Sequence, residues 1–128
     1  MWIFVGLLLL ARKTRLSLAQ LRDLARANGF PNPDLAAAVA MAESGGYAMA
    51  VGDVTLGFSI GLWQINLRAH PEYAATSLYD PTANARAAFK ISNHGTNWKP
   101  WTTFNNGAYK KFMPSKPATP PAPSEPTA

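Results

Sequence analysis

Glu43 is the carboxylate in this sequence with the least obvious structural role. It ends the apolar stretch AVAMAE (residues 38–43) and precedes Ser-Gly-Gly. A glutamate near a helix C-terminus is disfavoured by the helix dipole. Burial among small apolar residues would disfavour its charged form and raise its pKa. Such a glutamate can act as a general acid at neutral pH. The position therefore suggests acid–base chemistry, although a surface glutamate would fit it equally well.

The other reactive side chains have simpler explanations. Asp53 lies in a loop flanked by glycines, where a turn role is the default. His70 and His94 have no metal-ligand spacing, and surface or capping roles are expected for both. The chain has no cysteine, which excludes thiolate chemistry and cysteine metal sites. No serine follows the nucleophile-elbow pattern. We therefore expect no metal and no cofactor.

Three helices are expected to position these side chains, over residues 17–31, 32–44 and 80–95. Ser17 with Gln20 is typical of a capping box at the first helix. Asn32 and Asp80 are expected N-caps of the other two, and each is followed by proline. The second helix carries small side chains, so it should lie in the core with its neighbours close to it.

The rest of the chain includes a loop region, an aromatic-rich stretch at residues 97–113 that should hold short helices, and two flanking segments. Residues 47–60 should be irregular, with a short hairpin around Gly52 and Gly57. Residues 1–16 begin with an apolar run of about ten residues, roughly half of what a bilayer span requires. They would form a membrane-interface anchor or targeting segment, or a helix start buried against a partner. The proline-rich residues 114–128 should form a disordered tail. One domain is thus expected, over residues 17–113.

The net charge of +5 is unevenly placed. Residues 1–26 hold five of the twelve basic residues and a single aspartate, so the rest of the chain is nearly neutral. This distribution argues against a nucleic-acid groove across the domain. It fits weak attraction to an anionic membrane or cell wall.

Two stretches together are similar to motifs of soluble lytic transglycosylase (SLT) domains, goose-type-lysozyme-like proteins of the lysozyme superfamily. MAESGG contains the Glu-Ser pair that ends a helix in that family, and SIGLWQIN at residues 59–66 matches Gly-Leu-Met-Gln-Ile with Trp63 for methionine. Residues 103–107 are closest to the third motif, Ala-Tyr-Asn-Ala-Gly, with Phe104 for tyrosine. The resemblance covers residues 17–112. It implies a mainly α (α+β) lysozyme-like fold, with the hairpin segment beside the active-site groove.

The resemblance also implies a function: lytic cleavage of the β-1,4 bond between N-acetylmuramic acid and N-acetylglucosamine in peptidoglycan. Glu43 would protonate the bridging oxygen and then, as a carboxylate, accept the proton of the muramoyl C6 hydroxyl, giving a 1,6-anhydro product. One carboxylate can serve both steps, whereas ordinary glycosidases use two. The expected substrate-binding residues are Ser44, Asp53, Ser59, Trp63, Gln64, Tyr109 and, through their backbone, Asn105 and Asn106.

Several of these roles have alternatives. Ser44 would hold the turn after Glu43 or a sugar substituent, and Gln64 would bind substrate or orient Glu43. Trp63 would offer an apolar face to a pyranose ring or pack in the core, and core positions are favoured for Trp98 and Trp101. Tyr109 could supply the hydroxyl that Phe104 lacks.

The function itself has alternatives too. Asp53 could position a water, which would make the protein a lysozyme-type hydrolase. Without the family's tyrosine hydroxyl at Phe104, a non-catalytic wall-binding or virion-structural protein also fits. The expected partner is peptidoglycan, with no nucleic acid. The expected location is extracytoplasmic or on a virion, with membrane association through residues 1–16.

Overall fold

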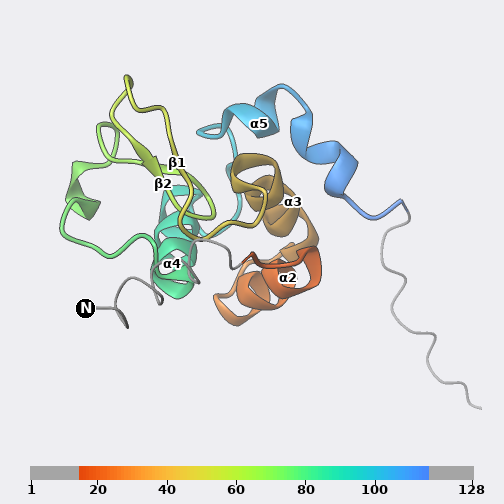
Figure 1. Cartoon of the computed structure of the whole chain (residues 1–128). Coiled ribbons are helices and arrows are strands. Elements are labelled where there is room, and N and C mark those ends of the chain that lie inside the picture. The colour runs from red at the N-terminus through yellow and green to blue at the C-terminus, as the bar shows by residue number, and fades with distance from the viewer. Residues whose placement is uncertain (1–14, 116–128) are drawn as a thin grey trace, which may run out of the picture.

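The computed structural model describes residues 15–115 (Figure 1). Within them lie four α-helices, two 3-10 helices and a three-stranded sheet, so the mainly α (α+β) fold class is confirmed. The expectations for the apolar run at the N-terminus and for most of the proline-rich segment fall on residues 1–14 and 116–128, outside the described part.

Local start signals determine where the first two long helices begin. Helix α2 (Leu18–Ala27) starts with the predicted capping box: the Gln20 N–H donates to Ser17 Oγ at 3.1 Å, and the Ser17 N–H donates to Gln20 Oε1 at 2.8 Å. Helix α3 (Pro33–Ser44) starts at Asn32, whose side chain accepts from the Leu35 N–H. It ends at Gly45, which adopts the left-handed conformation with φ 66°.

Helix α4 (Pro81–Ile91) is shorter than expected at its C-terminal end. Asp80 caps its start as predicted, through a 2.9 Å bond from the Ala83 N–H. The helix ends at Ile91 rather than near Gly95, because Asn93, His94 and Gly95 all have positive φ. Three successive left-handed residues cannot continue a right-handed helix. Gly95 is therefore part of a turn that follows the helix, and the helix itself ends before it.

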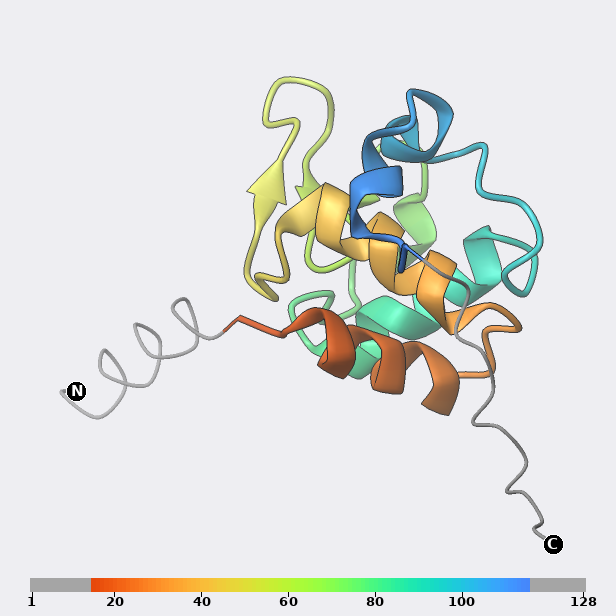
Figure 2. The same ribbon diagram turned by 90° about the vertical axis from the view of Figure 1, so that its right-hand side faces the viewer.

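Helix α3 runs through the middle of the domain, as its small side chains predict. Its residues 36–40 are completely buried. Helix α2 packs on one side of it, and α5 (Thr102–Asn105) and η2 (Ala108–Phe112) pack on another (Figure 2). Alanines at the contact allow this close approach. The end of α3, where Glu43 lies, is thereby held between several elements.

The predicted hairpin is present, and a third strand extends it. Strands β1 (Val51–Gly52) and β2 (Ser59–Ile60) pair antiparallel, with Val51 opposite Ile60. Strand β3 (Ile65–Asn66), which the sequence pattern did not predict, pairs with β2 so that Ser59 lies opposite Asn66. A 3-10 helix, η1 (Pro71–Tyr73), follows the sheet.

The mainly aliphatic core contains a cluster of aromatic side chains. Phe30 stacks on Trp63 and on Trp98, with ring centroids 5.9 and 5.6 Å apart. Trp98 and Trp101 are 4% and 5% exposed, which confirms their predicted core positions. None of the helices within residues 15–115 is both long enough and apolar enough to cross a membrane.

Candidate functional site

A groove of about 570 Å³ lies between the sheet and the segment that leads into α5. Glu43 reaches it from the end of α3. The sheet side contributes mainly polar residues, and the opposite side is formed by residues 100–103. The remaining residues that line the groove are Asp53, Ser59, Gln64, Ile65, Asn66, Ala69, His70 and Ile91. The groove therefore contains two carboxylates, Glu43 and Asp53.

Glu43 is half-buried and hydrogen-bonded. Thr103 Oγ1 donates to Glu43 Oε2 at 2.6 Å. Burial is the main cause that raises the pKa of Glu43 above its ordinary value, and the negative charge of Asp53 adds a smaller increase. The side-chain and backbone groups of Thr103 act in the opposite direction. The net shift is upward, which confirms the direction expected from the apolar end of the helix.

Thr103 is the site residue that the sequence reasoning missed. Tyr109 was a candidate source of the hydroxyl that Phe104 lacks, but within residues 15–115 the side chain that donates to Glu43 belongs to Thr103. The rings of Phe104 and Tyr109 stack on each other at 5.0 Å, and neither residue lines the groove. The hydroxyl that donates to Glu43 belongs instead to Thr103, the residue just before Phe104. The available signal was a threonine within the weakly matching third motif.

The backbone of Asn105 and Asn106 was expected to line the groove, but neither residue is among those that line it. Asn105 Nδ2 donates to the Lys99 carbonyl at 2.8 Å, and Asn106 Oδ1 accepts from the Ala108 N–H at 2.8 Å. Both side chains thus stabilise the turns on either side of α5. The chain faces the groove earlier, at residues 100–103.

Trp63 is a core residue, so its expected use as a sugar platform is wrong. Its side chain is completely buried, and its Nε1 donates to the Ala36 carbonyl of α3 at 3.0 Å. Its backbone carbonyl accepts from Trp101 Nε1 at 2.8 Å. Trp63 therefore joins α3 to the segment that carries Thr103. A pyranose ring has no access to its indole faces.

Asn84 of α4, which the sequence reasoning did not single out, holds the Gly61–Gln64 turn. Its Nδ2 donates to the carbonyls of Ile60 and Leu78 at 2.8 and 2.9 Å, and its Oδ1 accepts from the Trp63 N–H at 2.8 Å. Gly61 has φ 79°, and a Cβ there would collide with Asn84 Nδ2. The glycine of this motif is therefore required by close packing.

Gln64 lines the groove from this turn with an unusual backbone, φ 49°. Its Nε2 donates to the carbonyls of Ala50 and Gly61 at 3.1 and 3.0 Å. The amide nitrogen thus connects the loop that follows α3, at Ala50, to the Gly61–Gln64 turn. Of its side-chain atoms, the Oε1 acceptor is the one left to approach a ligand.

Ser44 uses its hydroxyl within the chain. Oγ donates to the Ala40 carbonyl at 3.0 Å and accepts from the Gly46 N–H at 3.2 Å. Of the two roles expected for Ser44, these bonds favour holding the turn after Glu43.

Asp53 serves the hairpin with its backbone and the groove with its side chain. Its carbonyl accepts from the N–H groups of Leu56 and Phe58, which closes the loop as the turn interpretation expected. Its carboxylate Oδ2 accepts from Ser59 Oγ at 2.7 Å. Ser59 is only 2% exposed. The carboxylate of Asp53 is therefore held by a buried hydroxyl of β2.

The two histidines differ in their surroundings. His70 lines the groove, with its Nδ1 3.6 Å from Glu72 Oε2. His94 stacks on Phe89, with ring centroids 4.7 Å apart. In the described part of the chain, no group of three or more His, Asp or Glu side chains is arranged to hold a metal ion.

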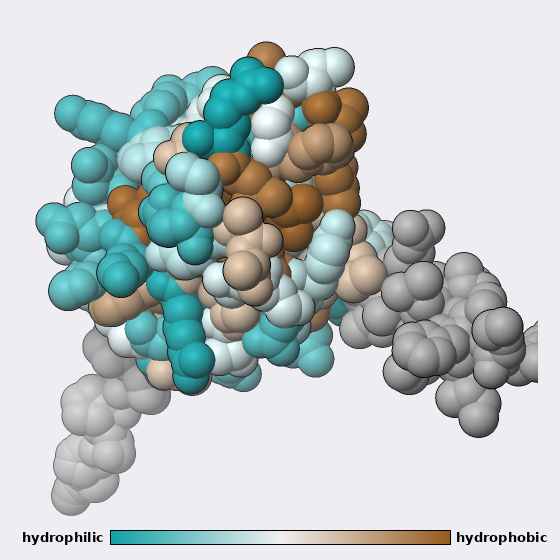
Figure 3. Space-filling view, turned by 90° about the vertical axis from the view of Figure 1, so that its left-hand side faces the viewer, coloured by the Kyte–Doolittle hydropathy of each residue, from teal (hydrophilic) through white to brown (hydrophobic). Residues whose placement is uncertain are grey.

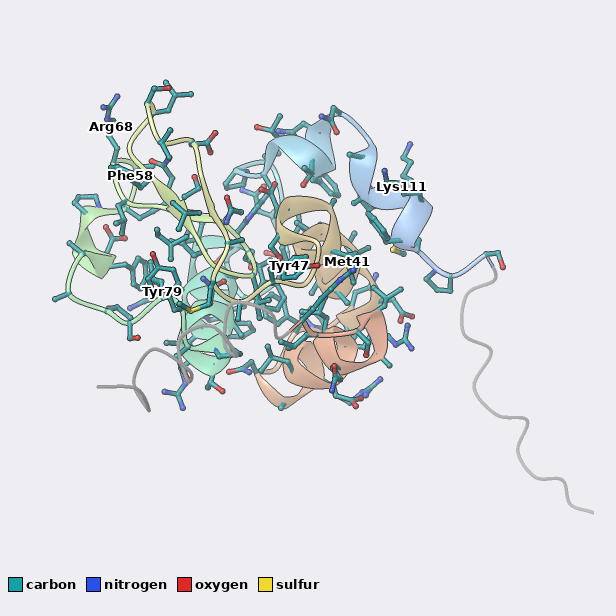
Figure 4. The ribbon with its side chains drawn as sticks, viewed as in Figure 1. Met41, Tyr47, Phe58, Arg68, Tyr79 and Lys111 are labelled. Atoms are coloured by element: carbon teal, nitrogen blue, oxygen red, sulfur yellow. The ribbon has the colours of Figure 1, made fainter. Side chains whose placement is uncertain are left out.

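The outer face of the hairpin is apolar. Val51, Val54, Leu56 and Phe58 are between 44% and 61% exposed. Apolar side chains gather at the upper right of the space-filling view, where this hairpin lies (Figure 3). Phe58 and Arg68 lie together at its outer edge, away from α3 (Figure 4). The hairpin thus presents a polar face to the groove and an apolar face outward.

Comparison with known proteins agrees with this geometry. A family model described as "Lysozyme like domain" matches residues 22–103, which include both walls of the groove and Glu43. No significant match was found among curated proteins or solved structures. The family match spans well over half of the chain, and the helical fold with its small antiparallel sheet is consistent with it. The chain therefore belongs to the lysozyme-like domain family.

Proposed function

We propose that the protein is a peptidoglycan lytic transglycosylase, with Glu43 as general acid and then general base. Membership of the lysozyme-like family supports, at a coarse level, an enzyme that cleaves peptidoglycan glycan strands. The single observation that carries the proposal is the state of Glu43. It lies in a groove with a raised pKa, and a hydroxyl donor contacts it at 2.6 Å. A protonated carboxyl group at the groove is what glycosidic cleavage first requires.

The proposed reaction moves one proton at each step. Glu43 gives its proton to the bridging oxygen, the bond between that oxygen and C1 of the muramoyl sugar breaks, and C1 gains oxocarbenium character. The Glu43 carboxylate then accepts the proton of the C6 hydroxyl, whose oxygen bonds to C1. The products are a 1,6-anhydromuramoyl end and a free N-acetylglucosamine hydroxyl. Thr103 stabilises Glu43 while it is ionised, between the two proton transfers.

Asp53 favours a second candidate, a lysozyme-type hydrolase. It lines the same groove as Glu43, and a second carboxylate is what water-dependent glycosidases use. Ser59 occupies Oδ2, whereas Oδ1 has no hydrogen-bond partner among residues 15–115. A water held by Oδ1 could attack C1 in place of the C6 hydroxyl. We rank this candidate second because the structural role of Asp53 in the hairpin already explains its hydrogen bonds to Ser59, Leu56 and Phe58.

Digestion of purified peptidoglycan distinguishes the two reactions. The products are treated with borohydride and measured by mass spectrometry. Anhydro ends that resist reduction support the transglycosylase, and reducible ends support the hydrolase. Glu43→Gln should still bind peptidoglycan without cleaving it. Wild-type protein that binds peptidoglycan and releases no fragments would refute both enzymes and favour a wall-binding or virion-structural role.

Asp53→Asn is the matched control, because asparagine can still accept the Ser59 hydrogen bond. A hydrolase should lose its reducing-end products in this variant. A transglycosylase should keep forming anhydro products at a reduced rate. The proposed substrate implies action outside the cytoplasm. Membrane or virion association through residues 1–16 stays a prediction.

A further inference from the structure

Two residues that precede helix α2 lie across the turn that follows Glu43. The Leu16 N–H donates to the Gly46 carbonyl at 2.8 Å. Arg15 Nε donates to the Gly45 carbonyl, also at 2.8 Å. We call Arg15 and Leu16 the strap. Both carbonyls belong to the backbone that leaves the end of α3, so the strap binds the chain almost directly after the reactive carboxyl group.

Further contacts hold the strap in place. Arg15 forms an isolated antiparallel bridge with Tyr47, and its guanidinium lies 5.2 Å from the centroid of the Tyr47 ring. The side chain of Leu16 packs against the hydrophobic core. Gly46 is buried beneath the strap, and a Cβ at that position would collide with the Leu16 carbonyl oxygen. The close approach of the two backbones therefore requires glycine.

Ser44 holds the same turn from its inner side. Its Oγ accepts from the Gly46 N–H at 3.2 Å and donates to the Ala40 carbonyl of α3 at 3.0 Å. The backbone of Gly46 is thus bonded at both of its polar groups, by Ser44 at the N–H and by Leu16 at the carbonyl. The turn is therefore fixed between the helix that it ends and the strap outside it.

The strap contacts this turn without entering the substrate groove. Neither Arg15 nor Leu16 is among the residues that line the groove. The causes that shift the pKa of Glu43 are burial, Thr103 and Asp53, so the charge of Arg15 does not act on it directly. The strap also precedes residues 22–103, which match the family model. Its contact with the turn thus joins the matched domain to a segment that the model does not cover.

We propose that Arg15 and Leu16 are positioning residues, which hold the turn after Glu43 and thereby fix its carboxyl group against Thr103 in the groove. The inference rests on the proposed cleavage at Glu43 and holds for either product. The 2.6 Å contact from Thr103 to Glu43 joins α5 to the end of α3, so its geometry depends on where that end lies. A displacement of about 1 Å caused by a remote substitution can cost roughly a hundredfold in rate.

Substitutions of Arg15 in the full chain test the strap, with soluble glycan strands of peptidoglycan as substrate. Arg15→Met keeps the aliphatic stem and removes the donor to Gly45. It should lower kcat by about tenfold and leave KM unchanged, because the strap lies outside the groove. Arg15→Gln carries an amide N–H as many bonds from the backbone as Nε, so it should retain more than about half of the activity.

Arg26→Met is the matched control. It removes an exposed arginine that pairs with Asp23 on α2, and it should have the wild-type kcat. Wild-type kcat in Arg15→Met would overturn the inference. Equal losses in Arg15→Met and Arg15→Gln would overturn it too, because the hydrogen bond to Gly45 would then not be the effective contact.

A double-mutant cycle separates positioning from a merely structural role. In the Thr103→Val background, Arg15→Met should lower kcat by less than about threefold, because the contact that the strap maintains is already absent. A merely structural role would lower kcat by the same factor in both backgrounds. Melting curves establish that each variant is folded at the assay temperature. Equal factors in the two backgrounds would therefore overturn the inference.

Alanine at the two glycines tests the strap from the other side. Gly45 and Gly46 both have positive φ, 66° and 88°, so alanine is strained at either position. At Gly46 the added methyl group would collide with the strap, whereas at Gly45 its nearest neighbour is Tyr47 Cδ2 at 3.5 Å. Gly46→Ala should lower kcat by about tenfold and Gly45→Ala by less than about threefold.

Equal losses in the two folded alanine variants would contradict the inference. Failure of wild-type protein to cleave peptidoglycan would instead refute the proposed function itself.

Discussion

Replacement of Thr103 by valine removes the hydroxyl that contacts Glu43 and keeps the shape of the side chain. The distance from Thr103 Oγ1 to Glu43 Oε2 is 2.6 Å, within the range of an O–H···O⁻ hydrogen bond. Thr103 lies second in the short helix α5, whose start is held by Trp101 in the core. Valine should therefore leave the fold intact and change the proton chemistry of Glu43.

The expected loss follows from the strength of such a bond. A hydrogen bond to a charged group contributes about 1.5–3 kcal/mol. Glu43 is ionised after it has protonated the bridging oxygen. The Thr103 hydroxyl stabilises this ionised form in the wild type, and Thr103→Val lacks that stabilisation. Since about 1.4 kcal/mol corresponds to a factor of ten, Thr103→Val should lower kcat by roughly 10- to 100-fold. The half-buried position of both side chains favours the lower part of this range.

The pH dependence has a definite sign. The Thr103 hydroxyl stabilises the carboxylate and therefore lowers the pKa of Glu43 against the larger effect of burial. In Thr103→Val the pKa rises further. Glu43 then keeps its proton to higher pH, and the alkaline limb of the activity profile should move upward while the maximal rate falls.

The assay is the release of soluble muropeptides from labelled peptidoglycan as a function of pH. Thr103→Ser is the matched control, since it keeps a hydroxyl at the same position and should retain most of the activity. The reasoning is refuted if Thr103→Val keeps the wild-type rate and alkaline limb, or if serine and valine lose activity equally.

The remaining predictions concern stability and the third motif. Glu43→Gln should have a higher melting temperature than wild type at neutral pH. The raised pKa of Glu43 means that the folding stability of the wild type falls as pH rises through the folded-state pKa. Melting curves at several pH values should show that the difference vanishes below the ordinary glutamate pKa of 4.5. Asn84→Ala should lower the free energy of unfolding by more than about 3 kcal/mol in urea titrations, because three buried backbone groups lose their partner. Trp63→Phe should lower the free energy of unfolding by about 1–3 kcal/mol with KM unchanged, because the hydrogen bond to the Ala36 carbonyl is lost. A raised KM with unchanged stability would instead support sugar binding by Trp63. Phe104→Tyr should leave kcat within about twofold of wild type, since that ring stacks on Tyr109 outside the groove; a large gain would mean that Thr103 is not the effective donor.

Features set by local sequence could be predicted well. The capping box at Ser17 and the N-caps at Asn32 and Asp80 depend on bonds over three residues, so the chain alone specifies them. The direction of the Glu43 pKa shift could also be predicted, because burial at an apolar helix end disfavours the charged form. The early end of α4 was missed because three left-handed residues, two of them not glycine, precede Gly95.

Features set by long-range contacts could not be predicted. The inward direction of Trp63 depends on the Ala36 carbonyl 27 positions away, and the contact from Thr103 to Glu43 spans 60 positions. Spacing within a motif does not show which side of a turn faces a groove. Asn105 and Asn106 were assigned to the groove for that reason, although they lie just beyond the residues that line it.

The position of Trp63 has a consequence for engineering the groove. Its indole and its carbonyl connect α3 to Trp101, and so connect the residue that carries the reactive carboxyl to the segment that carries its hydroxyl donor. Substitutions on that side would disturb the spacing of Glu43 and Thr103 together. The hairpin loop at residues 54–58 is exposed for most of its length and contributes no side chain to this connection. A variant library meant to alter the substrate range while Glu43 stays functional should therefore vary residues 54–58 and leave Trp63 and Trp101 unchanged.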